Sequence, residues 1–223
     1  MHSLMTETEG VIKYRLDHQD QPIDKNISIS EINAWRTLLF KLQLIGQIEN
    51  RYEGYGFGNI SQRINRPDSD DTQFIISGTQ TGGIESLSRQ HYSQVIMANP
   101  LKNHIRSIGE MPPSSEALTH ASVYQQDKAK QTVIHVHCPE IWNNTQQLSL
   151  CFTSADIAYG TPEMAIEVQR LLQTEKLKAK KIFSMLGHKD GIIAFSDNMG
   201  KTACNIIKTF KKAVQLEQTA LYS

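Results

Sequence analysis

Residues 132–137, Thr132-Val133-Ile134-His135-Val136-His137, form a β-branched run that ends in two histidines. Such a run is typical of a strand. Because side chains alternate across a strand, His135 and His137 are expected on one face, where two imidazoles can converge on a metal ion. The pattern alone does not distinguish a metal site from coincidence, since 8 histidines in one chain will sometimes fall two residues apart. It predicts a strand that carries half of a candidate metal site.

The whole chain has the composition of a globular protein that can bury a core. It has 223 residues, of which 39% are hydrophobic, and no linker rich in Pro, Gly or Ser divides it, so residues 1–223 are expected to form a single domain. The 23 basic residues balance the 23 acidic ones, which argues against nucleic acid and anionic membranes as partners.

No apolar run is long enough to span a bilayer. The first residues of the sequence also lack the basic segment followed by an apolar one that is typical of a secretory signal. The three cysteines form no CxxC motif and are expected to be free thiols in a reducing compartment. These features predict a cytoplasmic protein.

Helical and extended patterns alternate along the rest of the sequence. Ser28 and Glu31 have the spacing of a capping box, and Thr161-Pro162 is typical of a helix start. The patterns predict strands at 12–16, between about 61 and a polar turn at 66–71, and at 74–76, 182–186 and 192–195, and helices at about 28–45, at 87–98, from Ser114 or Ser115, from 161 and from 197 onward. This mixture predicts an α/β fold.

A third metal ligand is needed, because a catalytic zinc ion usually takes three protein ligands and leaves one position open for substrate or water. His188 is the best candidate, since it lies in the tight turn Gly187-His188-Lys189-Asp190-Gly191 between two predicted strands, where functional residues often occur. Four other histidines fall near the terminus, beside turns or in polar surroundings and are interpreted as surface residues: His2, His18, His91 and His104.

Glu116 adds a carboxylate at the start of the helix that precedes the His-x-His strand. It could ligate the metal, act as a general base, or only favour the helix dipole as many first-turn glutamates do. His120, one turn later, could hydrogen-bond to Glu116 or be an ordinary helix histidine. From position alone, the helix-dipole interpretation of Glu116 is favoured.

Two glycine-rich turns, Gly58-Asn59-Ile60-Ser61 and Gly78-Thr79-Gln80-Thr81-Gly82-Gly83, present backbone N–H groups beside small hydroxyl and amide side chains. Such turns can cradle anions, phosphate above all, without a basic side chain. They can also be simple turns, so the pattern marks them as candidate anion sites only.

Taken in order, these motifs resemble the class II aldolase and adducin family. The resemblance rests on Gly-Asn-x-Ser at 58–61, Pro-Ser-Ser-Glu at 113–116 followed by His120, the His-x-His at 135–137 and the later His188 beside a glycine. It covers the chain from the first predicted helix to the last. The family includes sugar-phosphate aldolases, an epimerase and a dehydratase, as well as the adducin head domain.

The resemblance implies a role for each motif. Zn²⁺ would be held by His135, His137 and His188, and Glu116 would bind the free metal and then act as the catalytic acid/base. The residues implied to hold substrate phosphate are Asn59, Ser61, Thr81, Gly82, Ser114 and Ser115. The implied fold is a three-layer α/β/α arrangement around a central, largely antiparallel sheet, in a homotetramer.

The implied activity is zinc-dependent aldol cleavage of a small hydroxy-carbonyl compound through a metal-stabilised enediolate, and the implied substrates are sugar phosphates. Three departures from the family pattern bear on this: the second glycine turn is longer, Lys189-Asp190 follows His188 where glycine is usual, and only Tyr159 offers a weak match to the proton-donating tyrosine. Glutamate at 116 disfavours the epimerase, which carries aspartate, and leaves aldolase or dehydratase. An adducin-like binding module without catalysis is the alternative from another class.

Overall fold

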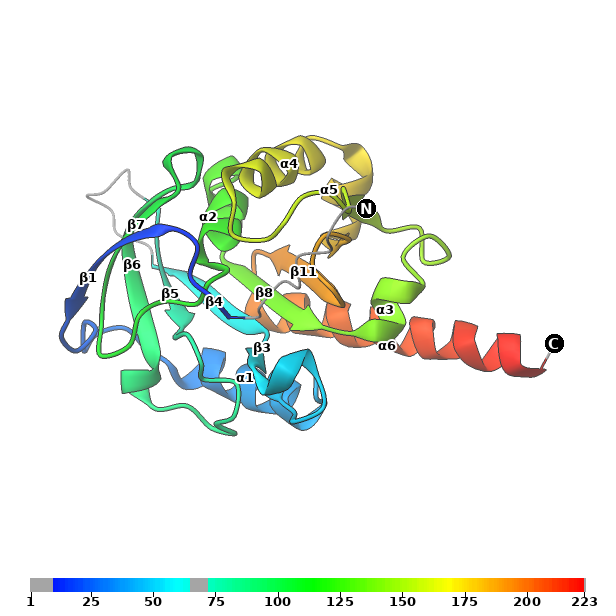
Figure 1. The fold of residues 1–223 in the computed structure, drawn as a ribbon, viewed down its shortest axis with the longest axis horizontal. Coiled ribbons are helices and arrows are strands. Elements are labelled where there is room, and N and C mark those ends of the chain that lie inside the picture. Colours follow the sequence, from blue (N-terminus) through cyan, green and yellow to red (C-terminus); the bar gives the residue numbers. More distant parts are fainter. Residues whose placement is uncertain (1–9, 65–71, 223) are drawn as a thin grey trace.

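The computed structural model of the protein describes residues 10–64 and 72–222. Its main feature is a nine-stranded sheet with the strand order β1-β7-β6-β5-β4-β8-β11-β10-β9 (Figure 1). In chain order its strands are β1 (Arg15–Asp20), β4 (Asn59–Ile64), β5 (Gln73–Ser77), β6 (Tyr92–Asn99), β7 (His104–Gly109), β8 (Thr132–His137), β9 (Cys151–Thr153), β10 (Ile182–Met185) and β11 (Gly191–Ser196). Neighbouring strands are antiparallel except for β1 with β7 and β9 with β10, so the sheet is largely antiparallel.

The remaining elements are helices and a small ribbon. The ribbon pairs β2 (Gly46–Gln47) with β3 (Gly56–Phe57). The α-helices are α1 (Ser30–Lys41), α2 (Ala117–Gln126), α3 (Pro139–Asn143), α4 (Pro162–Leu172), α5 (Glu175–Lys180) and α6 (Met199–Tyr222), and the short 3₁₀ turns are η1 (Tyr52–Gly54), η2 (Arg89–His91) and η3 (Pro100–Lys102).

Strand β8 lies near the centre of the sheet, between β4 and β11, and all of its residues are buried. Its side chains alternate as the β-branched run predicts. Val133 belongs to one hydrophobic core, whereas Ile134 and Val136 belong to the other. His135 and His137 therefore share the face of Val133.

Helices pack against both faces of this sheet, and each face has its own core (Figure 1). On the face that carries the histidines, α2 and α4 contribute residues such as Leu118 and Val168. On the other face, α1 and α6 contribute residues such as Ile32 and Ile206. The helix that carries Glu116 at its start thus covers the same face of the sheet as His135 and His137.

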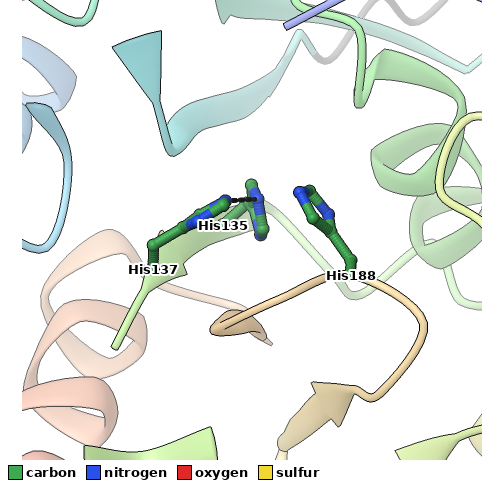
Figure 2. A group of neighbouring side chains, drawn as sticks. All are labelled: His135, His137 and His188. Atoms are coloured by element: carbon green, nitrogen blue, oxygen red, sulfur yellow. Dashed lines mark hydrogen bonds between the residues drawn. The ribbon is translucent and has the colours of Figure 1, made fainter. Parts of the chain in front are cut away.

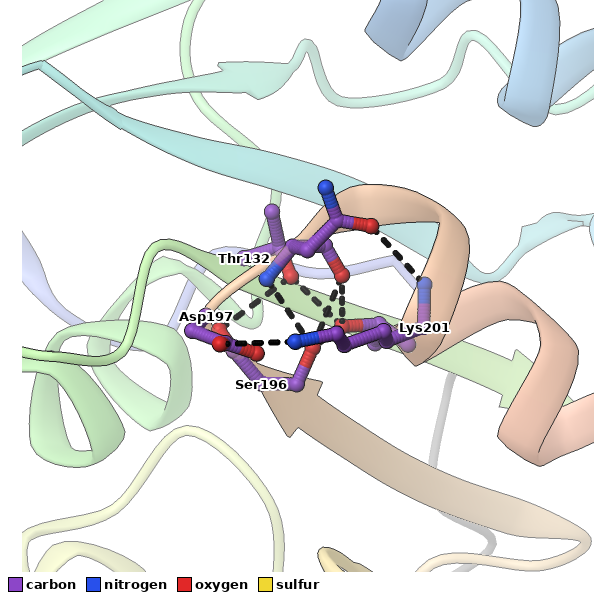
Figure 3. Close-up of polar contacts among 6 residues, drawn as sticks. Thr132, Ser196, Asp197 and Lys201 are labelled. Carbon is purple, nitrogen blue, oxygen red and sulfur yellow. Dashed lines mark hydrogen bonds and ion pairs between the residues drawn. The ribbon is translucent and has the colours of Figure 1, made fainter.

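A buried polar cluster joins the start of β8, the end of β11 and the start of α6 (Figure 3). The hydroxyl of Thr202 lies 2.5 Å from the hydroxyl of Thr132 and 2.8 Å from that of Ser196. Nearer the surface, the Lys201 ammonium lies 2.9 Å from the Asp197 carboxylate. These contacts satisfy polar groups at the helix start and fix α6 against β8.

The structure corrects several predicted boundaries. The predicted helix at 87–98 is wrong: the segment forms η2 and the interior strand β6. Periodicity cannot separate a buried strand from a helix in so short an apolar run, and pairing with β5 and β7 decides it. The first strand begins at Arg15 rather than 12, and α1 begins at Ser30, with Ile29 as its N-cap and no capping by a side chain.

Helix α2 begins at Ala117, so Glu116 takes the N-cap position predicted for Ser114 or Ser115. The predicted strands at 182–186 and 192–195 are confirmed within a residue or two, as is the helix capped by the Thr161 side chain. The last helix begins at Met199, two residues after the predicted start. The predicted turn at 66–71 lies outside the described residues.

Two further sequence-based expectations concern the cysteines and the membrane. Cys138, Cys151 and Cys204 are all free thiols. In the described part of the chain, none of the helices has the length and apolar character required to cross a bilayer.

Candidate metal centre and anion pocket

The three predicted histidine ligands lie together in the structure. Strand β8 presents His135 and His137 on one face, and the turn after β10 brings His188 against them (Figure 2). One nitrogen from each ring lies within 4.8 Å of the others, and the Nε2 atoms of His135 and His137 are 3.1 Å apart. All three side chains are at most 2% exposed.

This arrangement fits a divalent metal ion. With Zn–N bonds of about 2.0–2.1 Å, two nitrogens of a tetrahedral zinc site lie roughly 3.3 Å apart. The 3.1 Å separation between His135 and His137 is close to this value, and the three nitrogens all lie within 4.8 Å of one another, so the cluster has the size that one metal ion requires. Burial favours the neutral imidazole that a metal requires: it lowers the pKa of His137 well below its usual range, together with the neighbouring His188 and His135.

Gly191 provides the room for this cluster. It pairs with His137 across β8 and β11. A Cβ at this position would lie 3.2 Å from Cγ of His188 and 3.3 Å from Cε1 of His135, closer than side-chain carbons usually pack. The glycine that ends the Gly187-to-Gly191 turn is therefore part of the fit between the rings.

Glu116 lies beside the histidines, at the N-cap of α2. Its Oε1 is 3.4 Å from Nδ1 of His188, and the side chain is 1% exposed. Burial alone would raise the pKa of the Glu116 carboxyl, but contact with His188 and the charge of His135 outweigh burial and lower the pKa to about 2. The structure therefore places an ionised carboxylate next to the candidate ligands.

Aromatic rings enclose the cluster. Tyr52 contacts His137 edge-on with 4.6 Å between ring centroids, and Phe57 packs on the same histidine at 5.4 Å. On the other side, Tyr159 stacks on His188 at 4.5 Å, and the Lys13 ammonium lies 3.7 Å from the centre of the Tyr159 ring. These rings limit the orientations that the imidazoles can adopt.

Tyr52 and its partner Asp190 are not predicted as site residues from the sequence. The Tyr52 hydroxyl donates to Oδ2 of Asp190 at 2.7 Å and accepts from the Arg51 guanidinium at 2.7 Å. Both Tyr52 and Asp190 have positive φ, 49° and 62°. The available signal was Lys189-Asp190 after His188, where the family pattern has glycine.

A small polar cavity is lined by most of the predicted phosphate-binding residues. Its lining is almost entirely glycine, hydroxyl and amide side chains: Gly10, Gly56, Gly58, Asn59, Gly78, Thr79, Gln80, Thr81, Gly82, Ser114 and Ser115. Five of the six predicted substrate residues are among them, contributed by β4, the second glycine turn and the segment before α2. We refer to this cavity as the anion pocket.

Ser61 is the predicted substrate residue that does not line the anion pocket. Its hydroxyl lies 2.7 Å from Nδ1 of His120 and 2.7 Å from the Tyr124 hydroxyl, in a fully buried group. Burial, together with the charge of His135, lowers the pKa of His120 to about 3, so its ring is neutral. The structure thus places Ser61 and His120 in the packing between α2 and the sheet.

Comparison with known proteins agrees with these features. The sequence model of the class II aldolase and adducin N-terminal domain matches residues 47–222. No curated protein sequence matches the chain significantly.

Solved structures resemble the fold. A sugar-phosphate aldolase from Thermotoga maritima is 16% identical, with a TM-score of 0.64 over 87% of this chain and 95% of its own. L-fuculose-1-phosphate aldolase from Thermus thermophilus is 17% identical, with a TM-score of 0.62 over 86% of this chain and 94% of its own. At such low identity these likenesses concern the fold alone, but the sequence model spans most of the chain. The chain therefore belongs to the class II aldolase and adducin family.

Proposed function

We propose that this protein is a metal-dependent lyase that cleaves a small hydroxy-carbonyl compound carrying a phosphate, by aldol chemistry with zinc as the metal. The buried group formed by His135, His137 and His188 is the observation that carries the proposal. Three histidines buried together with a carboxylate beside them are costly to a fold unless they bind something. An adducin-like binding module has no need of this set.

The metal would be held by His135, His137 and His188, with Glu116 as a further ligand before substrate binds. When bound, it supplies Lewis-acid stabilisation of the negative charge that develops on substrate oxygens. Neutral imidazole ligands leave the full charge of the ion available for this purpose.

Glu116 would move the proton. Its carboxylate is ionised and lies within 3.4 Å of His188, so it can accept a proton from substrate bound at the histidines and return it to carbon after cleavage. Its position at the start of α2, next to Ser114 and Ser115 of the anion pocket, would bring the base and the phosphate-binding groups to one substrate.

The anion pocket would hold the end of the substrate that does not react. Hydroxyl, amide and backbone donors of Asn59, Thr81, Gly82, Ser114 and Ser115 are suited to phosphate oxygens. Binding energy from this end would position the reacting bond.

Further parts of the proposal concern architecture and setting. The two cores on opposite faces of the sheet support a three-layer α/β/α arrangement. We also propose a homotetramer by family resemblance, and a cytoplasmic location that agrees with three free thiols.

Metal content tests the proposal. Protein purified without added metal, then exposed to zinc and desalted, should retain about one equivalent of zinc, which the His135→Ala, His137→Ala double variant should lose. The matched control is the His18→Ala, His104→Ala double variant, since these histidines lie at the β1–β7 edge of the sheet. Equally little zinc in wild type and the first double variant would overturn the metal centre.

Activity tests the role of Glu116. Sugar phosphates and unphosphorylated hydroxy-acids should be screened for metal-dependent cleavage, and dehydration products measured alongside. Glu116→Gln should retain zinc through the histidines and lose turnover by about 10²–10⁴-fold. Unchanged turnover in Glu116→Gln would remove the assignment of the base, and a dehydration product would replace the aldolase by a dehydratase.

A further inference from the structure

The anion pocket lacks a charged lining. None of the residues that line it within 10–64 and 72–222 carries an ionisable side chain at neutral pH. Phosphate carries up to two negative charges, and neutral donors alone compensate them incompletely in a partly buried site. A positive charge behind the lining would therefore strengthen phosphate binding.

Arg36 of α1 lies behind the second glycine turn and hydrogen-bonds to backbone carbonyls in residues 81–85. Its guanidinium donates to the carbonyl oxygens of Thr81 at 2.9 Å, Gly82 at 3.3 Å and Glu85 at 2.8 Å, and also to that of Ile84. Thr81 and Gly82 also line the anion pocket. One side of this short segment thus contacts the cation while the other faces the pocket.

Among the residues that the structure describes, Arg36 has no acidic partner. The side chain is 1% exposed, and within the described part of the chain no carboxylate forms an ion pair with it. Burial lowers the pKa of Arg36 to about 10, which still leaves it charged at neutral pH. A buried charge held by backbone carbonyls and the face of the Phe40 ring, without a carboxylate, is costly, and a bound anion would offset that cost.

The hydrogen bonds from Arg36 to these carbonyls also orient N–H groups of the turn. In a trans peptide the C=O and N–H point in opposite directions, so drawing the Thr81 carbonyl toward Arg36 directs the Gly82 N–H away from it. The N–H groups of Thr81 and Gly82 donate to no acceptor among the described residues. Backbone donors left free beside a pocket are suited to an anion.

We infer that Arg36 is the positioning residue of the anion pocket: it supplies the positive charge for a phosphate group from behind the turn and aligns the turn's N–H groups with that phosphate. The inference rests on the proposed function in that the pocket takes the phosphate of the substrate. Arg36 lies before residue 47, where the match to the family's sequence model begins.

Binding of inorganic phosphate to the full-length protein, measured by calorimetry, tests this inference. Arg36→Met should weaken phosphate binding by about tenfold or more, as expected for loss of a unit charge one peptide layer from the ligand. Arg36→Lys keeps the charge but cannot span four carbonyls, so its affinity should fall between those of wild type and Arg36→Met. A role confined to folding predicts equal losses in the two variants.

Arg63→Met is the matched control. Arg63 also donates to three backbone carbonyls, those of Tyr124, Asp127 and Lys130, away from the anion pocket. Arg63→Met should lower the free energy of unfolding without changing phosphate affinity. If Arg36→Met fails to fold, Arg36→Lys decides, because unchanged affinity in that variant would overturn the inference.

The outcomes separate this inference from the proposed lyase activity. Equal phosphate affinity in wild type and Arg36→Met overturns the role of Arg36 and leaves the metal centre intact. Wild-type protein that retains zinc but binds no phosphate overturns the inference too. Protein that retains no zinc but loses phosphate binding in Arg36→Met keeps the inference and overturns the lyase.

Discussion

Replacing Tyr52 by Phe should destabilise the protein by removing one hydroxyl. That hydroxyl donates to Asp190, whose side chain is buried, and accepts from Arg51. It is the only side-chain donor to Asp190 within residues 10–64 and 72–222. A hydrogen bond to a charged group contributes about 1.5–3 kcal/mol, and its loss leaves the carboxylate buried without a donor.

We expect Tyr52→Phe to lower the free energy of unfolding by about 2 kcal/mol, which corresponds to a fall of roughly 4–8 °C in Tm for a chain of this size. The Phe ring would still pack on His137, so zinc stoichiometry should not change. Urea unfolding of the metal-free protein measures the effect. Tyr55→Phe is the control, because that tyrosine is 38% exposed and its hydroxyl makes no hydrogen bond to a described residue. A difference between the two variants below about 0.5 kcal/mol would refute the reasoning.

Two further predictions concern the anion pocket and the packing behind the metal centre. Gly82→Ala should lower the free energy of unfolding by about 1–3 kcal/mol and abolish phosphate binding, because a Cβ there would lie 2.6 Å from Cα of Gly56 and would overlap the Gly46 carbonyl oxygen. Gly83→Ala is the control, since a Cβ at that position meets only the flexible Gln47 side chain. It should resemble wild type in urea unfolding and in phosphate calorimetry. Burial lowers the pKa of His120 to about 3, so acid protonates the unfolded chain first, and the free energy of unfolding should fall by up to about 1.4 kcal/mol per pH unit between pH 6.5 and 3. The variant His120→Gln should lose this contribution to the pH dependence of the free energy of unfolding. Equal pH dependence in wild type and the variant would contradict the prediction.

The features that the sequence predicts well are those encoded locally. The β-branched run at 132–137 forms β8, and Thr161 caps α4 through its side chain. The sequence predicts the histidine trio because alternation along a strand puts His135 and His137 on one face and because His188 lies in a turn between two predicted strands. Each of these inferences needs only neighbouring residues and the geometry of one element.

The features that the sequence did not predict depend on partners far apart in the chain. Tyr52 and Asp190 are 138 residues apart, and both adopt a positive φ, which is uncommon for residues other than glycine. Arg36 lies within the predicted first helix, where no local pattern marks it, and only the tertiary structure shows that its guanidinium meets the segment at 81–85. The helix predicted at 87–98 failed for the same reason, because pairing with β5 and β7 determines its strand conformation.

The hydrophobic residues of β8 determine where its histidines point. Ile134 and Val136 are fully buried in the core beneath α1 and α6, so the alternate residues must face α2. In this register His135 pairs with Asn59 on one side and Ile193 on the other, which places the anion pocket and the His188 turn on opposite sides of the same strand. A slip by one residue would exchange the two faces and bury the imidazoles beneath α1. The apolar positions of β8 therefore constrain the candidate metal centre as strongly as the histidines do.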